Sequence, residues 1–250
     1  MILGMFLFFN ILSAKTIHVA IASNMSYVIK ELTQQFQAEY PHTKVIVSLG
    51  SSGKMTAQIK HGAPYQIFMS ADMRFPQRLY DEGSAVTKPA IYAQGSLAIF
   101  SSKKQNFTKG LYIVKDTALG TIVIANPKTA PYGKATMEAL KNSGIYDKIT
   151  SKLVYGESIA QTISYAVHIV DIGFVAKSSL FNPKMLRYKE GIHWIEVNPE
   201  FYTPIDQGIV ILKNGKNNKD VQAFYNFIFS PKAQNILKNF GYKIDRRAHV

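Results

Sequence analysis

The sequence predicts an α/β protein with two lobes, and two patterns indicate this fold class. Short apolar runs alternate with amphipathic helical patterns along the 250-residue chain, which is typical of sheets layered against helices. The alternation changes at residues 91–102, where a long strand-like stretch carries a central Gly95, and a strand-like run at 207–213 follows the second series of units. We therefore expect a first lobe, an inserted second lobe and a return of the chain to the first.

The first lobe is predicted to begin with a strand at residues 17–23 and a long helix after it. In that helix Val28, Leu32 and Phe36 recur at every fourth position and form one apolar face, and Pro41 then stops the helix. The other elements of this part are expected as strands at 43–49 and 65–70, a helix after residue 52 and a short helix at 74–83.

The second lobe repeats the alternation. A strand at 120–127 precedes a helix that opens at Pro131 and ends near Gly144, because proline suits the first helical turn and glycine the end of a helix. Ser158 is the predicted N-cap of the next helix. The remaining elements are expected as strands at 172–178, 193–198 and 207–213 and as two C-terminal helices, the second opening at Ser230–Pro231 and ending near Gly241.

The N-terminal segment, the order of the elements and the absence of cysteine predict the domain organisation and the cellular location. Residues 1–14 are almost wholly apolar and end in small residues, as a secretory signal peptide does. We assign residues 15–93 and 205–250 to lobe 1 and residues 94–204 to lobe 2. No later stretch reaches the about 18 apolar residues that a membrane span needs, and the absence of cysteine excludes disulfides, thiolate metal sites and a lipid-bearing cysteine. A soluble, exported, periplasmic protein is expected.

The chain is basic, with 29 Lys and Arg against 16 Asp and Glu and a net charge of +13. Such a charge raises nucleic acid or an anionic membrane as partners. The basic residues are scattered, however, with no run of five and no nucleic-acid motif. We interpret the charge as solvated surface and expect no nucleic-acid partner.

The same local pattern is predicted at four points of the chain. In each, a strand ends, a short polar turn follows, and a helix begins. These junctions are Ser23–Asn24, Ser51–Ser52, Pro131–Tyr132 and Ser158–Ile159. Each helix start leaves up to four backbone N–H groups without intrahelical partners and carries partial positive charge, so it can receive an anion. Ordinary capping by the Ser and Asn side chains also explains each junction taken alone. The two hydroxyls between Gly50 and Gly53 exceed what one cap needs, which favours a ligand there.

Other chemistries fit the sequence less well. A nucleotide P-loop over Gly50 to Lys54 is rejected, because Ser48 replaces its first glycine and Met55 replaces the hydroxyl residue after the lysine. The six histidines are dispersed, without the spacing of a zinc site. Asp72 is a candidate general base, but no partner carboxylate, cysteine or histidine lies nearby in sequence. Capping of a turn is the simpler interpretation of Asp72.

Five stretches of the chain, read in order, carry a family resemblance. They are AIASNM, SLGSSGKMTAQIKHGAPYQIFMSAD, ANPKTAPYGKATMEAL, GESIAQTISYAVHIVDIGFVAKSSL and AFYNFIFSPKAQNILKNFGY. Together they resemble the periplasmic molybdate-binding proteins of ABC transporters. The resemblance implies a type II periplasmic-binding-protein fold, in which two lobes, each a mixed sheet flanked by helices, close over a tetrahedral oxyanion in the cleft. It also implies a transport function, with no catalytic residues and no cofactor.

The resemblance further implies which residues hold the ligand. The matched positions are Ser23, Asn24, Ser52, Tyr132 and Ile159. In the family the two serines donate hydroxyls, the positions of Tyr132 and Ile159 donate backbone N–H groups, and the position of Asn24 contributes in some members. Ala176 stands where some members carry a ligand-binding tyrosine, which makes Asn24 a stronger candidate for the replacement donor.

The implied ligand is molybdate, with tungstate as a second oxyanion. The implied partner is an ABC permease in the inner membrane, to which a monomeric binding protein delivers the ligand. Two alternatives stay open at this point. One is a binding protein for sulfate or a small organic anion, and the other is an exported phosphate-handling enzyme that uses Asp72 as base.

Overall fold

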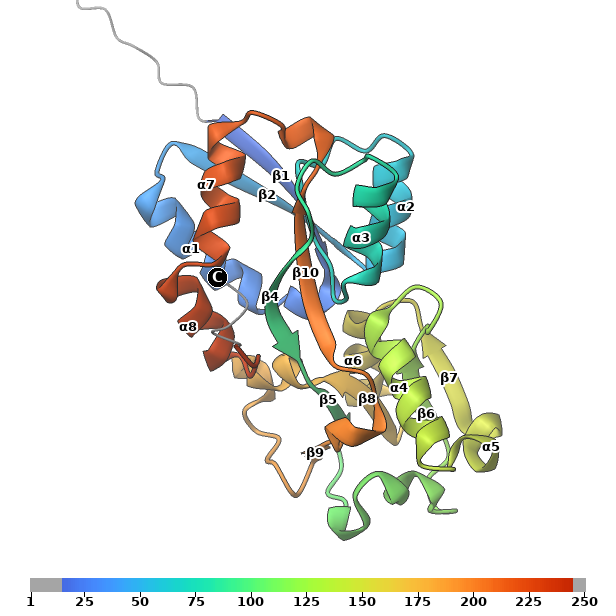
Figure 1. The fold of residues 1–250 in the computed structure, drawn as a ribbon. Coiled ribbons are helices and arrows are strands. Elements are labelled where there is room, and N and C mark those ends of the chain that lie inside the picture. Colours follow the sequence, from blue (N-terminus) through green and yellow to red (C-terminus); the bar gives the residue numbers. More distant parts are fainter. Residues whose placement is uncertain (1–14, 245–250) are drawn as a thin grey trace, which may run out of the picture.

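The computed structural model describes residues 15–244, and it contains two five-stranded sheets that are each flanked by helices (Figure 1). The predicted signal peptide at residues 1–14 lies outside the described residues. No helix within residues 15–244 is long and apolar enough to cross a membrane.

The first sheet has the strand order β2-β1-β3-β10-β4. Its strands are β1 (Lys15–Ala22), β2 (Thr43–Gly50), β3 (Ile67–Met69), β4 (Ala90–Gly95) and β10 (Ile205–Ile211). Strand β1 pairs in parallel with β2 and β3, whereas β10 runs antiparallel to β3 and β4. The carboxyl ends of β1, β2 and β3 therefore meet at one edge of this sheet, which is where the polar turns follow.

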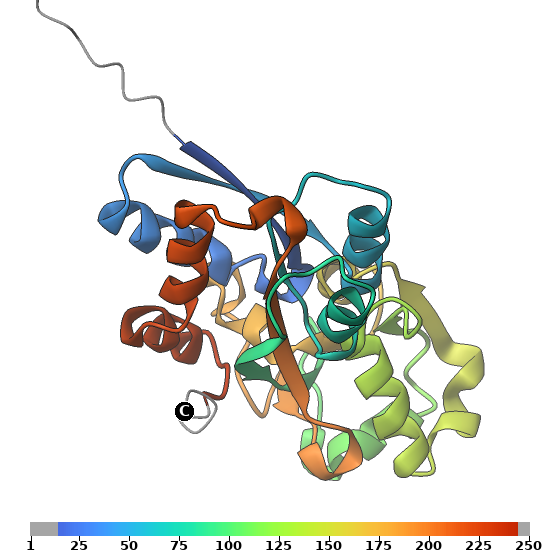
Figure 2. The same ribbon diagram turned by 45° about the horizontal axis from the view of Figure 1, so that its top comes forward.

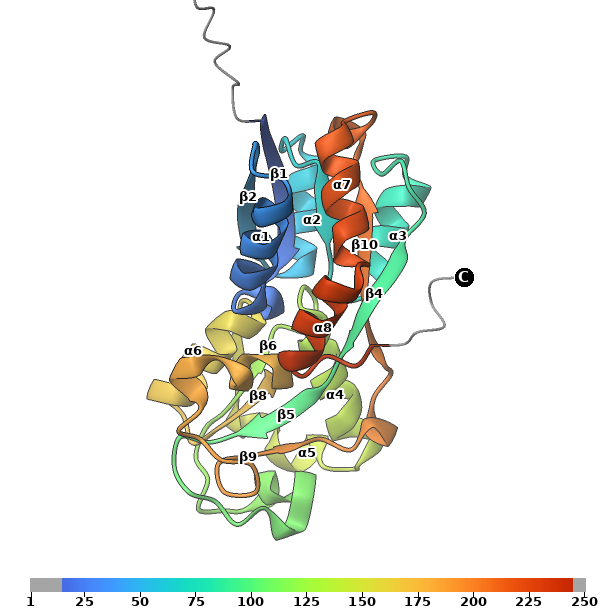
Figure 3. The same cartoon turned by 90° about the vertical axis from the view of Figure 1, so that its left-hand side faces the viewer.

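Helices cover both faces of the first sheet, and alternate residues of β1 explain this layering (Figure 3). Val19 and Ile21 pack with α1 (Val28–Glu39), α7 (Lys219–Ile228) and α8 (Pro231–Asn239), while Ala20 faces α2 (Ser52–Lys60) and α3 (Arg74–Asp81). Successive side chains of a strand point to opposite faces, so an apolar strand buried on both sides needs a helix layer on each.

The second sheet has the order β7-β6-β8-β5-β9. Its strands are β5 (Leu97–Phe100), β6 (Ile122–Ala125), β7 (Leu153–Gly156), β8 (Ile172–Ala176) and β9 (Trp194–Glu196), and its helices are α4 (Pro131–Asn142), α5 (Tyr146–Ile149) and α6 (Ile159–His168). Ile122 and Ile124 face the cluster that includes α4, whereas Val123 faces α6. Short 3-10 helices complete the chain: η1 (Ser23–Met25), η2 (Phe107–Lys115), η3 (Thr150–Lys152), η4 (Lys177–Phe181), η5 (Pro183–Met185), η6 (Pro199–Phe201) and η7 (Lys213–Gly215).

Strands β4 and β10 lie side by side and lead from the first sheet toward the second (Figures 1 and 2). The expected passage of the chain into a second lobe at Gly95 is confirmed, but the expectation of one long strand at residues 91–102 is wrong. The segment forms two strands, because β4 pairs with β10 in the first sheet and β5 pairs with β8 and β9 in the second. The chain thus crosses between the sheets at Ser96 and returns between β9 and β10.

The predicted helix ends are confirmed where local signals were clear. Helix α4 begins at Pro131, and the Ser158 side chain accepts the backbone N–H of Gln161 at the start of α6. Gly83 and Gly144 have φ values of +70° and +67° just after their helices, a conformation that costs glycine little. The 3-10 helix η2 was not predicted. Its buried Phe107, Leu111 and Val114 recur at helical spacing, but Gly110 interrupts the element with a φ of +55°.

Phe36 is the aromatic centre of the helix layer on the first sheet, and its truncation tests this packing. The ring is fully buried and meets Phe224 edge to face, with centroids 5.0 Å apart. We expect Phe36→Ala to lower the free energy of unfolding by about 3–5 kcal/mol, measured by urea denaturation. Tyr40→Ala is the control, since Tyr40 stacks on Phe36 but is 39% exposed. An equal loss in both variants would contradict the assignment of Phe36 to the core.

Candidate anion-binding site

The predicted site residues converge between the two sheets. Ser23 and Asn24 follow β1, and Ser52 opens α2 directly after β2. From the other side, Tyr132 lies in the first turn of α4 and Ile159 opens α6. Residues from both lobes form one buried cluster here, and its members at the site include Ala22, Ala71, Ala130, Tyr132 and Ile159. The structure therefore brings all four strand-to-helix junctions together.

The serine hydroxyls of the site are buried and free to donate. Ser23 and Ser51 are 5% and 4% exposed, and neither Oγ atom has a hydrogen-bond partner among the described residues. Ser52 is fully buried, and its Oγ accepts the backbone N–H of Ala71 at 3.0 Å. Because a hydroxyl both accepts and donates, Ser52 keeps its proton available for a ligand.

Backbone N–H groups add further donors. The amides of Asn24, Tyr132 and Ile159 make no hydrogen bond within residues 15–244. Tyr132 and Ile159 are 1% and 3% exposed, so these groups are not left to bulk water. Buried backbone donors without partners are rare in folded proteins and call for an acceptor. At the starts of α4 and α6 the helix dipole also favours a negative charge.

The side-chain NH2 group of Asn24 already donates both of its hydrogens to other residues of the protein. Its Nδ2 donates to Oε1 of Gln207 at 2.8 Å and to the hydroxyl of Tyr242 at 2.8 Å, which uses both amide hydrogens. Its Oδ1 is buried and has no partner among the described residues. A donor role for Asn24 therefore falls to its backbone N–H.

The phenol of Tyr132 is buried beside this amide. Its hydroxyl forms no hydrogen bond of normal geometry with any described residue. Burial raises the pKa of Tyr132 well above its usual value, and the nearby Asn24 side chain offsets this only in part. The phenol consequently stays protonated. It lies against Gly95, where any side chain would overlap the Tyr132 hydroxyl, so glycine is required at this crossing of the chain.

Charged side chains stay out of the interior. None of the Asp, Glu, Lys or Arg residues within 15–244 is buried. The candidate base Asp72 caps a turn, since its Oδ1 accepts from the backbone N–H of Phe75 and from the hydroxyl of Ser70, both at 3.3 Å. Asp72 is partly buried, and the loss of solvent around its carboxyl raises its pKa, an effect that Arg74 opposes. No group of three or more His, Cys, Asp or Glu that could hold a metal occurs in the described part of the chain.

Two contacts join the lobes at the outer side of the site. The N–H of Gly53 donates to the carbonyl of Thr129 at 2.9 Å, and Nζ of Lys54 lies 2.7 Å from Oε1 of Glu157. A Cβ on Gly53 would come within 3.0 Å of the Thr129 backbone, so glycine permits the close approach. We call these two contacts the cleft latch. The latch follows the Ser51–Ser52 turn directly and links the two lobes at this point.

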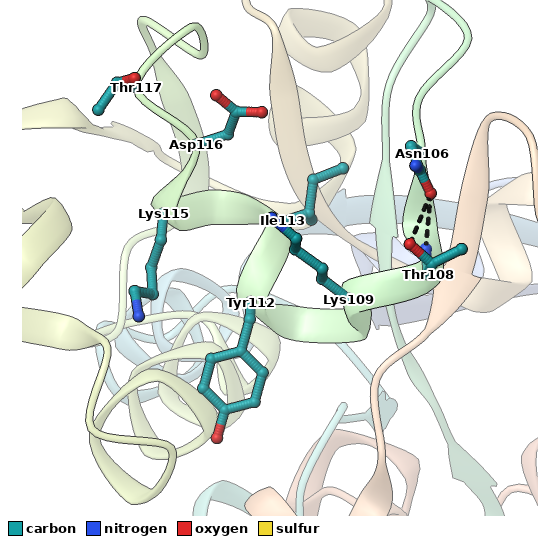
Figure 4. Close-up of a pocket in the computed structure, with 8 residues that line it drawn as sticks. All are labelled: Asn106, Thr108, Lys109, Tyr112, Ile113, Lys115, Asp116 and Thr117. Carbon is teal, nitrogen blue, oxygen red and sulfur yellow. Dashed lines mark hydrogen bonds between the residues drawn. The ribbon is translucent and has the colours of Figure 1, made fainter.

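A separate hollow of about 460 Å³ lies on η2, away from these residues (Figure 4). Its wall contains Asn106, whose Oδ1 accepts both the backbone N–H and the hydroxyl of Thr108 at 3.1 and 2.7 Å. Tyr112 and Lys115 extend outward along the same element. None of the predicted site residues lines this hollow, and the polar group of Asn106 is satisfied locally.

Two lobes that close over buried, uncharged hydrogen-bond donors define a solute-binding protein. The chain belongs to the family of bacterial extracellular solute-binding proteins, which it matches over residues 17–243. This confirms the fold class and the family resemblance predicted from the sequence.

Individual relatives cover nearly the whole chain. The molybdate-binding protein ModA of Azotobacter vinelandii is 37% identical over 231 residues, covering 92% of this chain and 90% of that protein. ModA of Rhodobacter capsulatus is 34% identical over 232 residues, covering 92% and 89%. The solved structure of the Azotobacter vinelandii periplasmic molybdate-binding protein aligns with a TM-score of 0.85 at 32% identity, over 92% of this chain and 100% of that one.

A more distant structure shares the fold alone. The sulfate-binding protein SubI of Mycobacterium tuberculosis aligns with a TM-score of 0.75 at 15% identity, covering 94% of this chain and 88% of that one.

Sequence reasoning missed several residues that shape the site. Gln207 and Tyr242 reach Asn24 from 183 and 218 residues away, and Glu157 reaches Lys54 from 103 residues away. No local pattern marks such partners. Gln207 could have attracted notice only as a polar residue within the otherwise apolar return strand.

The serine hydroxyls provide the first test of the site. We expect Ser23→Ala and Ser52→Ala each to weaken anion binding by about 1.5–3 kcal/mol, the range for hydrogen bonds to charged groups. This corresponds to roughly 10- to 150-fold in dissociation constant, measured by calorimetry. Ser51→Ala should cost less than Ser52→Ala, which also loses the Ala71 N–H as a partner. The reverse order would assign the ligand to the other hydroxyl of the turn.

The cleft latch provides a second test, based on rates. Lys54 and Glu157 are 52% and 62% exposed, so their ion pair is weak, and we expect Lys54→Ala to speed dissociation of a bound anion about two- to fivefold. Stopped-flow competition measures this rate. The charge swap Lys54→Glu with Glu157→Lys should restore the slower rate.

A matched control lies within one lobe. Lys232 and Glu39 form an ion pair of 2.6 Å with 50% and 41% exposure, between α8 and α1. Lys232→Ala should leave dissociation unchanged. If Lys54→Ala alters the rate no more than Lys232→Ala does, the ion pair does not act as a latch.

Proposed function

We propose that this chain is the substrate-binding component of a molybdate ABC transporter. The observation that carries the proposal is the convergence of buried serine hydroxyls and unpartnered backbone N–H groups in a site without charged side chains. Such a site suits a dehydrated oxyanion, because each oxygen can accept hydrogen bonds while the helix starts balance the charge. The identity of 37% to a molybdate-binding protein over 92% of the chain selects molybdate among oxyanions.

The donor set also bears on selectivity. Fully ionised molybdate or tungstate can use every donor of the site, whereas hydrogen phosphate carries a proton that needs an acceptor. The unpartnered groups of the site are mainly donors, namely the hydroxyls of Ser23 and Ser51 and the backbone N–H groups. Oδ1 of Asn24 is an unpartnered acceptor beside them, so selectivity against hydrogen phosphate rests on the surplus of donors. Sulfate is smaller than molybdate, and its shorter bonds would leave some fixed donors out of reach.

The proposal assigns a role to each predicted residue. Ser23 and Ser52 donate hydroxyls, and Tyr132, Ile159 and Asn24 donate backbone N–H groups. The protein works as a monomer in the periplasm, where it passes the ligand to a permease in the inner membrane. It needs no cofactor, has no nucleic-acid partner, and is a carrier rather than an enzyme, in keeping with the capping role of Asp72.

Calorimetry against four oxyanions tests this function. We expect tight, one-to-one binding of molybdate and tungstate, and binding of sulfate and phosphate at least about 100-fold weaker, which corresponds to roughly 2.7 kcal/mol. Sulfate binding as tight as molybdate would replace the proposal with a sulfate carrier. Turnover of phosphoester substrates, abolished by Asp72→Asn, would instead support the enzyme alternative.

A further inference from the structure

A buried polar cluster lies directly behind the anion site. It consists of Asn24, Gln207 and Tyr242, which are 1%, 0% and 3% exposed, and we call it the hinge amide cluster. Nδ2 of Asn24 donates to Gln207 and to the Tyr242 hydroxyl, and the Tyr242 hydroxyl donates back to the carbonyl of Asn24 at 3.2 Å. The cluster joins η1, the return strand β10 and the segment after α8.

The orientation of the two side-chain amides follows from the backbone carbonyls around Gln207, which can only accept. Nε2 of Gln207 donates to the backbone carbonyls of Ala71 and Ile205 at 3.3 and 3.0 Å. Carbonyl oxygens cannot donate, so Oε1 of Gln207 must face Asn24. Asn24 must then turn its NH2 group toward Gln207 and its Oδ1 away, which fixes the rotamer of the residue that follows Ser23.

Gln207 also reaches the second serine turn. The carbonyl of Ala71 accepts from Gln207, and the N–H of Ala71 donates to Oγ of Ser52 at 3.0 Å. One side chain on β10 is therefore bonded to Asn24 on one side and, through a single residue, to Ser52 on the other. Gln207 sits where the pairing of β10 with β4 shifts register, next to the crossing between the lobes.

We propose that Gln207 is a positioning residue for the oxyanion, acting through Asn24 from the return strand. This inference rests on the proposed function, because it concerns the same ligand. The Gln207 side chain has no free hydrogen-bonding group for the anion, because Oε1 and both hydrogens of Nε2 are bonded to protein groups. Its effect on affinity comes from holding the main chain of η1, and with it the Ser23 hydroxyl and the Asn24 N–H, at the edge of the site.

A double-mutant cycle on binding affinity tests this role. Gln207→Met keeps the length of the side chain and removes its hydrogen bonds, and we expect molybdate binding about 3- to 10-fold weaker by calorimetry. In an Asn24→Ala background the same substitution should weaken binding by a clearly smaller factor, because residues that act as one unit are not additive and only the link through Ala71 to Ser52 remains. Melting temperatures are recorded for each variant.

Gln94→Met is the matched control. Gln94 lies on the neighbouring strand β4, and its Nε2 donates to Oδ1 of Asp206 at 2.8 Å, whereas the Asn24 amide bonds to Gln207 and Tyr242. We expect it to change the affinity for molybdate by less than twofold even where it lowers the melting temperature. A similar loss of affinity in Gln94→Met and Gln207→Met would overturn the proposal, since general weakening of the hinge would then explain both.

Tyr242→Phe keeps the test decisive if Gln207→Met does not fold. This variant removes the other acceptor of the Asn24 amide, and its loss of affinity should be smaller in the Asn24→Ala background, where only the bond from the Tyr242 hydroxyl to the carbonyl of residue 24 is left to lose. Additive losses in the cycle that folds would overturn the positioning role while leaving the proposed function intact. A wild-type chain that binds neither molybdate nor tungstate would overturn both.

Discussion

Backbone N–H groups without partners, gathered where two sheets face each other, are the constraint on which this structure depends. Parallel strands place their carboxyl ends at one edge, so each following helix begins there and exposes its first amides. An interior cannot leave such donors unsatisfied. The two lobes bring these edges together and bury them, and the proposed oxyanion would accept the hydrogen bonds that these groups can donate.

The remaining features of the site serve this arrangement without adding charge. Glycine at position 95 leaves room for the Tyr132 phenol, and glycine at position 53 lets two backbones touch. Asn24 is held from behind by Gln207 and Tyr242, so the first turn after β1 keeps its shape. Lys54 and Glu157 act only at the rim, where water screens them. Precision thus comes from hydrogen bonds and close packing rather than from ion pairs.

Features that depend on neighbouring residues could be predicted from the sequence, whereas contacts between distant residues could not. Pro131 and Ser158 predicted the starts of α4 and α6, which carry the backbone N–H groups of Tyr132 and Ile159. The two hydroxyls after Gly50 indicated the polar turn before α2. The crossing near Gly95 was expected, but the division of the stretch into two strands was not, because an apolar strand does not state which sheet it joins. The hydrogen-bond partners of Asn24, Gln207 and Tyr242, were not predicted either, because they become neighbours of Asn24 only in the folded protein.

The uncharged interior has a consequence for how the protein responds to acidity. Burial keeps the pKa of Tyr132 and Tyr242 above the usual range, so the phenols beside the site do not ionise at neutral pH. Hydroxyl and amide donors have no titration of their own in that range. The protein therefore contributes a constant set of hydrogens in that range. With the proposed function, any change of affinity with pH near neutrality would come from protonation of the oxyanion and not from the site.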